Sequence, residues 1–299
     1  MDFCKITHND KNTIEKYTKS WEIENNDFNF TTLYLWGKHG KIKYAEQDDI
    51  LFIHYDFPDY PQFFLPPIPR DVQSDYKKAV NTAIEEMRKM GIKPCFRSVS
   101  EPFYKLLTDS LEQYEEERTP FNDDYVYLAQ SLAELKGKKL HSKRNHINSF
   151  IANNDNWEYV KITSNDLREC MDLYDQWSLG KNEPTLDDYD ERLTVELAIK
   201  YMDDLKLFGG GIRINGILKA FSIGEHTSRD MMTVHIEKAD ASVNGLFPLI
   251  NQQFVIHESN GAKYVNREDD MGIEGLRKAK LSYHPCRMIE KYKITLKED

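Results

Sequence analysis

The predicted secondary-structure elements of this 299-residue chain follow the same order twice. In the first half, hydrophobic spacing predicts a helix over 10–28, three strands within 30–57, a helix over 74–90, a strand over 93–99 and a helix over 103–117. In the second half it predicts helices over 167–179 and 195–204, three strands within 206–238, a helix over 246–258 and a strand over 264–268. Each half contains a helix, a three-strand meander, a helix and a strand. This repeat of element order predicts an α+β fold in which mixed central sheets are flanked by helices.

A basic segment connects the two halves. Residues 129–152 carry leucine and isoleucine at helical spacing, and Gly137 marks an interruption. We predict an N-terminal domain over 1–137, a C-terminal domain with the candidate site over 138–299, and a basic bridging helix near 130–152. Runs of charge usually form a solvated helix face, but they also suit RNA phosphates. Both interpretations remain open at this point.

Composition excludes several classes of protein. The formal net charge of −10 argues against a general nucleic-acid binder, although it leaves room for a local basic groove. No apolar run reaches the roughly 18 residues of a membrane helix, and the start of the chain lacks a signal-peptide pattern. The four cysteines are scattered, which indicates free thiols and no zinc site. We therefore expect a cytoplasmic protein.

The stretch 263–285 begins as a strand and then becomes strongly polar. Its polar residues include Asn266, Arg267, Glu268, Asp269, Arg277 and Lys280. Polar groups at the end of a core strand lie either on the surface or in a site. One interpretation is an anion site built from the cations, and the other is an internal salt-bridge network. The acidic residues lack the spacing of a calcium or zinc site, so we expect no metal.

The strand 231–238 alternates apolar and polar residues. This alternation predicts that Thr233, His235 and Glu237 share one face of the sheet. That face either meets solvent or lines a cleft, where His235 or Glu237 would accept a proton. Glu225, near the end of the preceding strand, is either a second carboxylate for binding a substrate amine or part of an ordinary approach to a turn after Gly224.

Several motifs carry a family resemblance. They are NREDDMGIEGLRKAKLSY at 266–283 followed by Pro285, LKGKKLHSKRNHINSF at 135–150, AFSIGE at 220–225, HIEKAD at 235–240 and NGLFPLINQQF at 244–254. Together they resemble the phosphatidylglycerol lysyltransferase C-terminal-domain family, and in particular its soluble branch of unknown function. The resemblance implies a tandem of GNAT-like domains, as in the Fem-type aminoacyltransferases. The repeated element order agrees with that fold.

The resemblance implies an acyltransferase and gives the candidate residues their roles. Transfer needs a base for the nucleophile, donors for the oxyanion and an acid for the leaving group. The implied catalytic residues are Glu237 or His235 as base, with Lys280 or Tyr283 as acid. The implied substrate-binding residues are Arg144, Asn145, Glu225, Asn266, Arg267, Glu268, Asp269 and Arg277. The implied partners are the acceptor end of an aminoacyl-tRNA as donor and a small molecule or lipid head group as acceptor.

The loop 242–248 decides between two acyl donors. In a GNAT protein this loop holds the pyrophosphate of coenzyme A and contains two small residues. Gly245 occupies the position of the first of them. Phe247, however, replaces the second small residue and would obstruct the phosphate. Aminoacyl-tRNA is therefore the expected donor, coenzyme A the less favoured one, and no cofactor is required. The alternatives are a coenzyme A-dependent N-acyltransferase for a small amine and a non-catalytic binding protein on the same fold.

Overall fold

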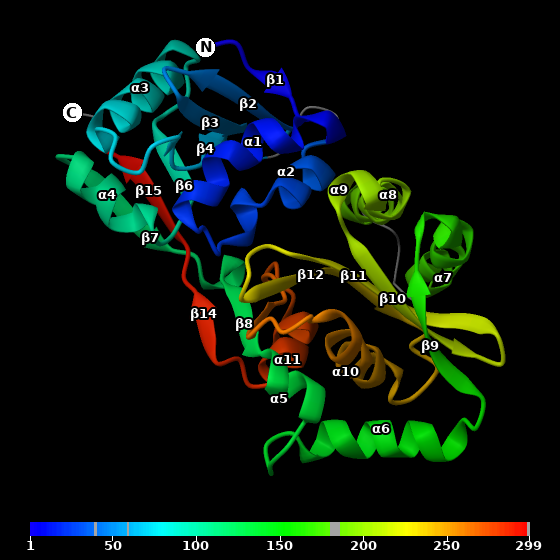
Figure 1. The fold of residues 1–299 in the computed structure, drawn as a ribbon. Coiled ribbons are helices and arrows are strands. Elements are labelled where there is room, and N and C mark those ends of the chain that lie inside the picture. Colours follow the sequence, from blue (N-terminus) through cyan, green and yellow to red (C-terminus); the bar gives the residue numbers. More distant parts are fainter. Residues whose placement is uncertain (39–40, 59, 180–185, 298–299) are drawn as a thin grey trace. The chain divides into compact units, whose positions relative to one another are not determined.

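A computed structural model describes residues 1–38, 41–58, 60–179 and 186–297, and the side chains of residues 186–190 are left out of the description (Figure 1). Its α-helices are α1 (Lys11–Thr18), α2 (Phe30–Trp36), α3 (Tyr76–Lys89), α4 (Phe103–Ser110), α5 (Ala129–Glu134), α6 (His141–Asn153), α7 (Leu167–Leu179), α8 (Leu186–Lys200), α9 (Met202–Leu205), α10 (Leu246–Glu258) and α11 (Glu274–Leu281). Its first eight strands are β1 (Cys4–Lys5), β2 (Ile42–Gln47), β3 (Ile50–Tyr55), β4 (Phe63–Phe64), β5 (Ile68–Pro69), β6 (Cys95–Val99), β7 (Tyr114–Arg118) and β8 (Asp124–Leu128). The others are β9 (Trp157–Ile162), β10 (Phe208–Ile214), β11 (Ile217–His226), β12 (Met231–Ala239), β13 (Tyr264–Asn266), β14 (Arg287–Ile289) and β15 (Tyr292–Leu296).

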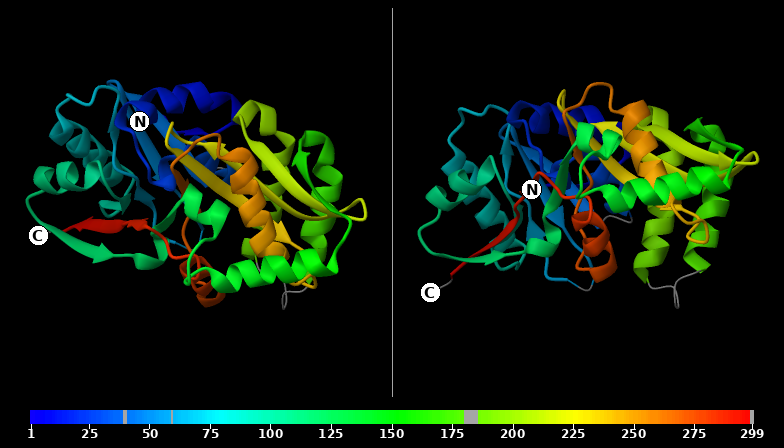
Figure 2. Two further views of the ribbon diagram at one scale, coloured as in Figure 1. Left: turned by 60° about the horizontal axis from the view of Figure 1, so that its bottom comes forward. Right: turned by 90° about the horizontal axis from the view of Figure 1, so that it is seen from below.

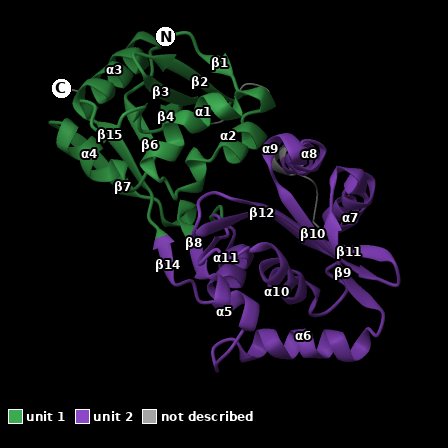
Figure 3. Cartoon of the chain, in the orientation of Figure 1, with its two compact units in different colours: residues 1–124, 269–272, 289–299 green, residues 125–268, 273–288 purple. Residues whose placement is uncertain are grey.

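The chain forms two compact units that are not continuous in sequence (Figure 3). Unit 1 contains residues 1–124, 269–272 and 289–299, and unit 2 contains residues 125–268 and 273–288. The division that the sequence analysis placed after residue 137 therefore lies inside unit 2, between α5 and α6. Strand pairing explains the difference, because β8 joins the sheet of unit 2 before the bridge begins.

Unit 1 is built on a sheet with the strand order β1-β2-β3-β4-β6-β15-β7, in which β5 also pairs with β3. The strand β15 comes from the end of the chain, yet it lies between β6 and β7 and is antiparallel to both. The helix α3 shows why these residues fold locally as they do. Asp75 caps its first turn by accepting a hydrogen bond from Lys78 N, and its apolar residues recur on one buried face.

The helix expected over 10–28 is shorter than predicted, because α1 ends at Thr18 and only 3-10 turns follow, over Lys19–Trp21 and Asn26–Phe28. Two further segments of unit 1 differ from the prediction. Residues 30–36 form the helix α2, where a strand was expected, because Asn29 accepts hydrogen bonds from Thr31 N and Thr32 N and so starts a helix. All six residues from Phe30 to Leu35 are buried, the two threonines included, so this segment has no exposed polar face and no helical period. The expected helix over 103–117 ends at Ser110, and residues 114–118 form β7.

Unit 2 is built on a sheet with the strand order β14-β8-β13-β12-β11-β10-β9. The strands β12 and β13 are parallel, whereas β11 is antiparallel to both of its neighbours. The helix α10 packs on one face of this sheet together with α5 and α6, and α7 packs against β11 and β12 (Figure 2). A core of buried side chains, including Phe150, Phe254 and Val265, fills the space between the sheet and α10. The edge strand β9 was not predicted.

Among the described residues, no helix combines the length and the apolar character that crossing a membrane requires.

Candidate functional site

Two parallel strands of unit 2 separate along their length. The strands β12 and β13 pair only where Met231–Thr233 lie beside Tyr264–Asn266. Beyond this point β12 continues along β11 to Ala239, whereas Arg267 and Glu268 follow β8 through backbone hydrogen bonds with Tyr125. We call the region between residues 234–239 and residues 267–268 the wedge. Its two sides contain four of the polar residues that the sequence singled out: His235, Glu237, Arg267 and Glu268.

The first bridge across the wedge is built around His235. Its Nδ1 lies 2.7 Å from Glu268 Oε1, and its Nε2 lies 2.9 Å from Glu225 Oε1. Burial by itself lowers the pKa of His235, but the hydrogen bonds to the two carboxylates outweigh burial and raise this pKa to about 9. His235 is therefore an imidazolium at neutral pH, with both nitrogens donating. In that state it has no lone pair with which to accept a proton.

A bulge at His235 changes which residues of β12 share a face. Ile223 lies opposite Ile236, but the next residue, Gly224, lies opposite Val234, so β12 contains one extra residue at this point. As a result Glu237 lies on the same side as Val234, where it contacts α10. The expectation that Thr233, His235 and Glu237 share one face was therefore wrong, because strict alternation does not survive a bulge.

The second bridge joins Arg267 to Glu237. Arg267 Nη2 donates to Glu237 Oε1 at 2.8 Å, and Asn251 Nδ2 on α10 donates to Glu237 Oε2 at 3.2 Å. The guanidinium also lies 5.2 Å from the ring centroid of Tyr283 and 5.9 Å from that of Tyr127. Only 11 % of the Arg267 side chain is exposed, and within the described structure its Nη1 is buried without a hydrogen-bond acceptor. A buried donor in this state is suited to an incoming anion.

Two further lysines lie at this bridge. Lys280 is buried on α11 and donates from Nζ to the Arg267 carbonyl oxygen at 2.5 Å, so it holds the backbone beside the guanidinium. Lys143 on α6 lies 4.2 Å from the Tyr283 ring centroid, and burial together with the charge of Arg267 lowers its pKa. Tyr283 is itself buried, and burial raises its pKa well above the usual range. Tyr283 therefore keeps its proton at neutral pH.

The other predicted binding residues do not meet at the wedge. Arg144 donates to the carbonyl oxygens of Leu135 and Gly137, so it closes the end of α5. Asn145 is exposed on α6, and its Nδ2 lies 3.3 Å from His141 Nδ1. Arg277 is half-buried on α11.

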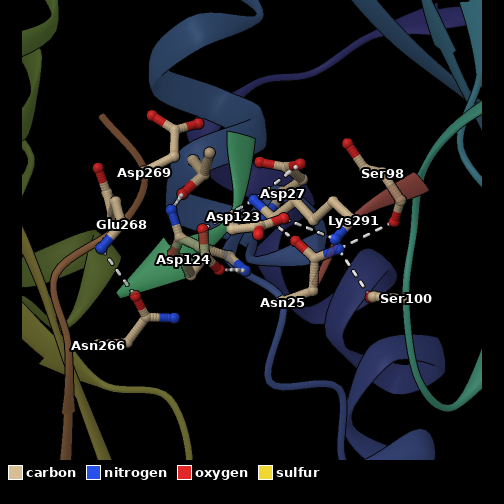
Figure 4. Close-up of polar contacts among 12 residues, drawn as sticks. Asn25, Asp27, Ser98, Ser100, Asp123, Asp124, Asn266, Glu268, Asp269 and Lys291 are labelled. Atoms are coloured by element: carbon tan, nitrogen blue, oxygen red, sulfur yellow. Dashed lines mark hydrogen bonds and ion pairs between the residues drawn. The ribbon is translucent and has the colours of Figure 1, made fainter. Parts of the chain in front are cut away.

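Two more of the predicted residues shape the turn after β13. The Oδ1 of Asn266 accepts a hydrogen bond from Glu268 N at 2.7 Å (Figure 4). Asp269 belongs to unit 1 and accepts from Met271 N at 3.1 Å. Both side chains bond to backbone two residues further on, which fixes the turn locally.

The local backbone explains why residue 245 is a glycine. Its φ of +85° is a conformation that favours glycine, and a Cβ built on it would lie 2.3 Å from the His146 carbonyl oxygen of α6. The close approach of α6 thus explains this glycine without any phosphate. Phe247, the next position that bears on coenzyme A, is 36 % exposed at the start of α10.

The sequence analysis missed four residues that the fold brings to the wedge: Lys143, Asn251, Tyr127 and Ser222. Asn251 is a single amide on the buried face of an apolar helix, which is the pattern that would have revealed it. Ser222 lies opposite Glu237 in the β11–β12 register, and its buried Oγ has no hydrogen-bond partner in the described part of the chain. Only the strand register shows that Ser222 belongs here.

Neither a metal site nor the groove of unit 1 coincides with these residues. Among the described residues, no group of three histidine, cysteine or carboxylate side chains is arranged to hold a metal ion. A groove of about 630 Å³ lies in unit 1, and none of the residues predicted for the site lines it. The buried polar residues of the wedge, and not this groove, are therefore the candidate site.

Comparisons with known proteins place these features in a family. The family model described as "Phosphatidylglycerol lysyltransferase, C-terminal" matches residues 19–295. A conserved protein of unknown function from Bacteroides thetaiotaomicron is 33 % identical, with a TM-score of 0.91 over 99 % of this chain and 100 % of that one. L-PGS from Bacillus licheniformis has a TM-score of 0.68 at 13 % identity over 96 % and 92 % of the two chains. FemX has a TM-score of 0.57 at 9 % identity over 98 % and 97 %.

A further relative, an uncharacterised protein from Mycoplasmoides gallisepticum, is 27 % identical over 178 residues. That match covers 57 % of this chain and only 55 % of the relative. Taken together, the comparisons confirm the predicted family and the predicted fold class of tandem GNAT-like domains with mixed sheets and flanking helices.

Proposed function

This chain belongs to the phosphatidylglycerol lysyltransferase C-terminal family and has an acyltransferase-like fold, and on that premise we propose that it transfers an aminoacyl group from an aminoacyl-tRNA to an amine or hydroxyl acceptor. The observation that carries the proposal is the buried Arg267–Glu237 pair with its unpartnered guanidinium nitrogen at the wedge. A pair of this kind places a hydrogen-bond donor for an anion beside a carboxylate. No cofactor is needed for such a transfer.

In the proposed reaction, the acceptor nitrogen or oxygen attacks the ester carbonyl of the donor. A bond forms between the nucleophile and the carbonyl carbon, and the bond to the tRNA ribose oxygen breaks. The acceptor gives up one proton, and the ribose oxygen takes one. Each oxygen of Glu237 accepts one hydrogen bond and keeps a second lone pair, so Glu237 is able to receive the proton of the acceptor.

Arg267 binds the negative charge that develops on the carbonyl oxygen, or a phosphate of the donor. Its Nη1 has a proton to donate, and its surroundings are largely shielded from water, which strengthens the interaction. Lys280 and Tyr283 position this guanidinium, the first through the Arg267 carbonyl oxygen and the second through its ring. His235 holds Glu225 and Glu268 as a fixed cation and is not the base.

The basic side chains of α6 support the choice of donor. Lys143 lies on this helix, and the exposed Lys138 and Lys139 lie in the segment just before it. Exposed cations on the segment that leads into α6, whose Lys143 contacts Tyr283, suit the phosphates of a tRNA acceptor end. By contrast, α6 lies so close to the start of α10 that the carbonyl oxygen of His146 fills the space beside Gly245, where a coenzyme A phosphate would need to approach.

The test follows radiolabel from a pool of aminoacyl-tRNAs, in parallel reactions, to phosphatidylglycerol vesicles and to soluble glycerol phosphate, with labelled acetyl-coenzyme A as the competing donor. We expect label to leave the tRNA only when an acceptor is present. We expect Glu237→Gln to slow transfer at least about 100-fold, the size of a general-base contribution. The matched control is Glu169→Gln, because Glu169 is an exposed carboxylate on α7 that accepts a hydrogen bond from Arg213 and lies outside the wedge.

Each arm decides one part of the proposal. Transfer from acetyl-coenzyme A alone would replace the donor that we propose. Unchanged transfer by Glu237→Gln would remove Glu237 from the mechanism. If no labelled donor is consumed with either acceptor, the aminoacyl-transfer proposal fails, and a binding role on the same fold takes its place.

A further inference from the structure

Unit 1 contains a groove that is separate from the residues of the wedge. Its volume of about 630 Å³ falls within the range of sites for small organic ligands. Strands β6, β15 and β7 contribute residues to its lining, as do residues 60–62 and the segment 90–93 that follows α3. All of these residues belong to unit 1, so the groove is complete within it.

The groove is lined by an arginine, Arg97, that forms no ion pair with any residue that the structure describes. The guanidinium of Arg97 lies 4.8 Å from the ring centroid of Phe63, and Phe63 in turn stacks on Tyr55 with a centroid distance of 4.7 Å. Phe63 thus supports one side of the guanidinium. In the described structure, the Arg97 Nε is buried and has no hydrogen-bond acceptor.

Among the charged residues of the groove, Arg97 is the best placed to donate hydrogen bonds to an anion. Lys293 also lines the groove, but its Nζ lies 2.8 Å from Glu117 and is already neutralised. Lys93 adds a second cation at the exposed rim. Glu115 is a lining carboxylate, but it is exposed to water, which screens its repulsion of an anion. The N–H groups of the Arg97 guanidinium are therefore available to an anion, because the other charged side chains of the groove are either paired or screened by water.

The rest of the lining is mixed, with the polar side chains of Gln62 and Thr295 and an apolar part. Tyr60 is 65 % exposed and Met90 is 39 % exposed, and both line the groove beside Ile92. Exposed aromatic and methionine side chains around a charged centre favour a ligand that has an apolar body as well as a charge.

We propose that this groove binds a small organic oxyanion, a carboxylate or a phosphate ester on an apolar or aromatic body, with Arg97 as its anion-binding residue. The carboxylate or phosphate oxygens accept from the Arg97 fork, and the body of the ligand rests against Tyr60, Met90 and Ile92. This site is independent of the proposed aminoacyl transfer and requires none of the wedge residues.

The test is calorimetric titration of the full chain with three probes of similar shape: phenylacetate, phenyl phosphate and neutral benzyl alcohol. We expect at least one anionic probe to bind at least 10-fold more tightly than benzyl alcohol, and the stronger of the two identifies the oxyanion. Arg97→Gln should weaken the binding of that anion at least 10-fold. Arg70→Gln is the matched control, because Arg70 is an exposed arginine of unit 1 that does not line the groove.

Arg97→Lys, which keeps the charge but loses the fork, separates binding from folding. We expect it to retain the thermal midpoint of the wild type and to bind the anion with intermediate affinity. The proposal is wrong if neither anion binds at 10 mM, if benzyl alcohol binds as well as the anions, or if both Arg97 variants bind like the wild type.

Discussion

A single histidine controls the charge balance on one side of the wedge. His235 is buried between Glu225 and Glu268, and both of its ring nitrogens are within hydrogen-bond distance of a carboxylate. Two carboxylates around a neutral imidazole would leave buried negative charge uncompensated, which is costly. The protonated form of His235 removes this cost, and for this reason its pKa rises to about 9 although burial opposes the rise.

This pKa predicts how stability depends on pH. Because the folded-state pKa of His235 is above the value of about 6.5 for an unfolded chain, its contribution is complete below pH 6.5 and is lost as the pH rises through 9. At about 1.4 kcal/mol for each pH unit, we expect the free energy of unfolding to fall by roughly 3 kcal/mol across this window. Urea unfolding at pH 6, 7, 8 and 9.5 measures it.

The control for this prediction is His235→Gln, which places an uncharged side chain between the same carboxylates. We expect it to lower stability at pH 6 and to flatten the loss between pH 6.5 and 9. If the wild type and the variant lose the same free energy over that range, His235 is not the group that titrates.

At the scale of single residues, the sequence identified the polar residues of the site but not the partners with which they pair. It singled out His235, Glu237, Arg267 and Glu268 because polar groups on core strands are unusual. Their pairing was not predictable, because it depends on where strands separated by about 30 residues lie beside one another. Arg144 illustrates the limit: its charge indicated a ligand, and its two backbone acceptors give it a role in closing α5.

At the scale of elements, one extra residue in β12 decides the composition of the site. The bulge opposite Ile223 and Gly224 moves Glu237 to the side of α10, where it meets Asn251 and Arg267. The periodic pattern of the sequence placed the strand correctly but gave no sign of the bulge. Sequence spacing also placed α7 and α10 at their observed bounds, because both bury side chains that recur at helical spacing.

The junction of α6 and α10 gives the prediction at this scale. Gly245 and Gly261 both have a φ of +85°, but only at Gly245 would a Cβ meet backbone, at 2.3 Å from the His146 carbonyl oxygen. Gly261→Ala should cost only the left-handed conformation, about 1–2 kcal/mol. Gly245→Ala should cost distinctly more, because α6 must also move. Urea unfolding of the two variants gives both values.

Gly261→Ala is the control for Gly245→Ala. Both variants lose the free energy of a left-handed backbone conformation, but only Gly245→Ala brings a Cβ against the His146 carbonyl oxygen. Equal losses in the two variants would mean that α6 does not hold α10 tightly. In that case the explanation of Gly245 by close packing would fail, and its positive φ alone would account for this glycine.

At the scale of the whole chain, the end of the sequence completes the fold of its beginning. The strand β15 lies between β6 and β7, so unit 1 needs residues from both ends of the chain. Just before β15, Lys291 is fully buried, with its Nζ 2.7 Å from Asp124 Oδ1 and 3.1 Å from Asp27 Oδ2 (Figure 4). No local pattern predicts this arrangement, because its members are separated by 97 or more residues.

The Lys291 cluster gives the last prediction. Burial alone lowers the pKa of Lys291, but Asp124 and Asp27 outweigh burial and raise it, so this lysine stays charged. Lys291→Met leaves the buried Asp124 carboxylate and the partly buried Asp27 carboxylate without this cation, and we expect a loss of about 3–5 kcal/mol in the free energy of unfolding. Adding Asp124→Asn removes one of these charges and keeps an acceptor for Asn26 N, so it should recover part of the loss. Urea unfolding of both variants tests this, and a double variant no more stable than Lys291→Met would show that the charges are not what holds these parts of unit 1 together.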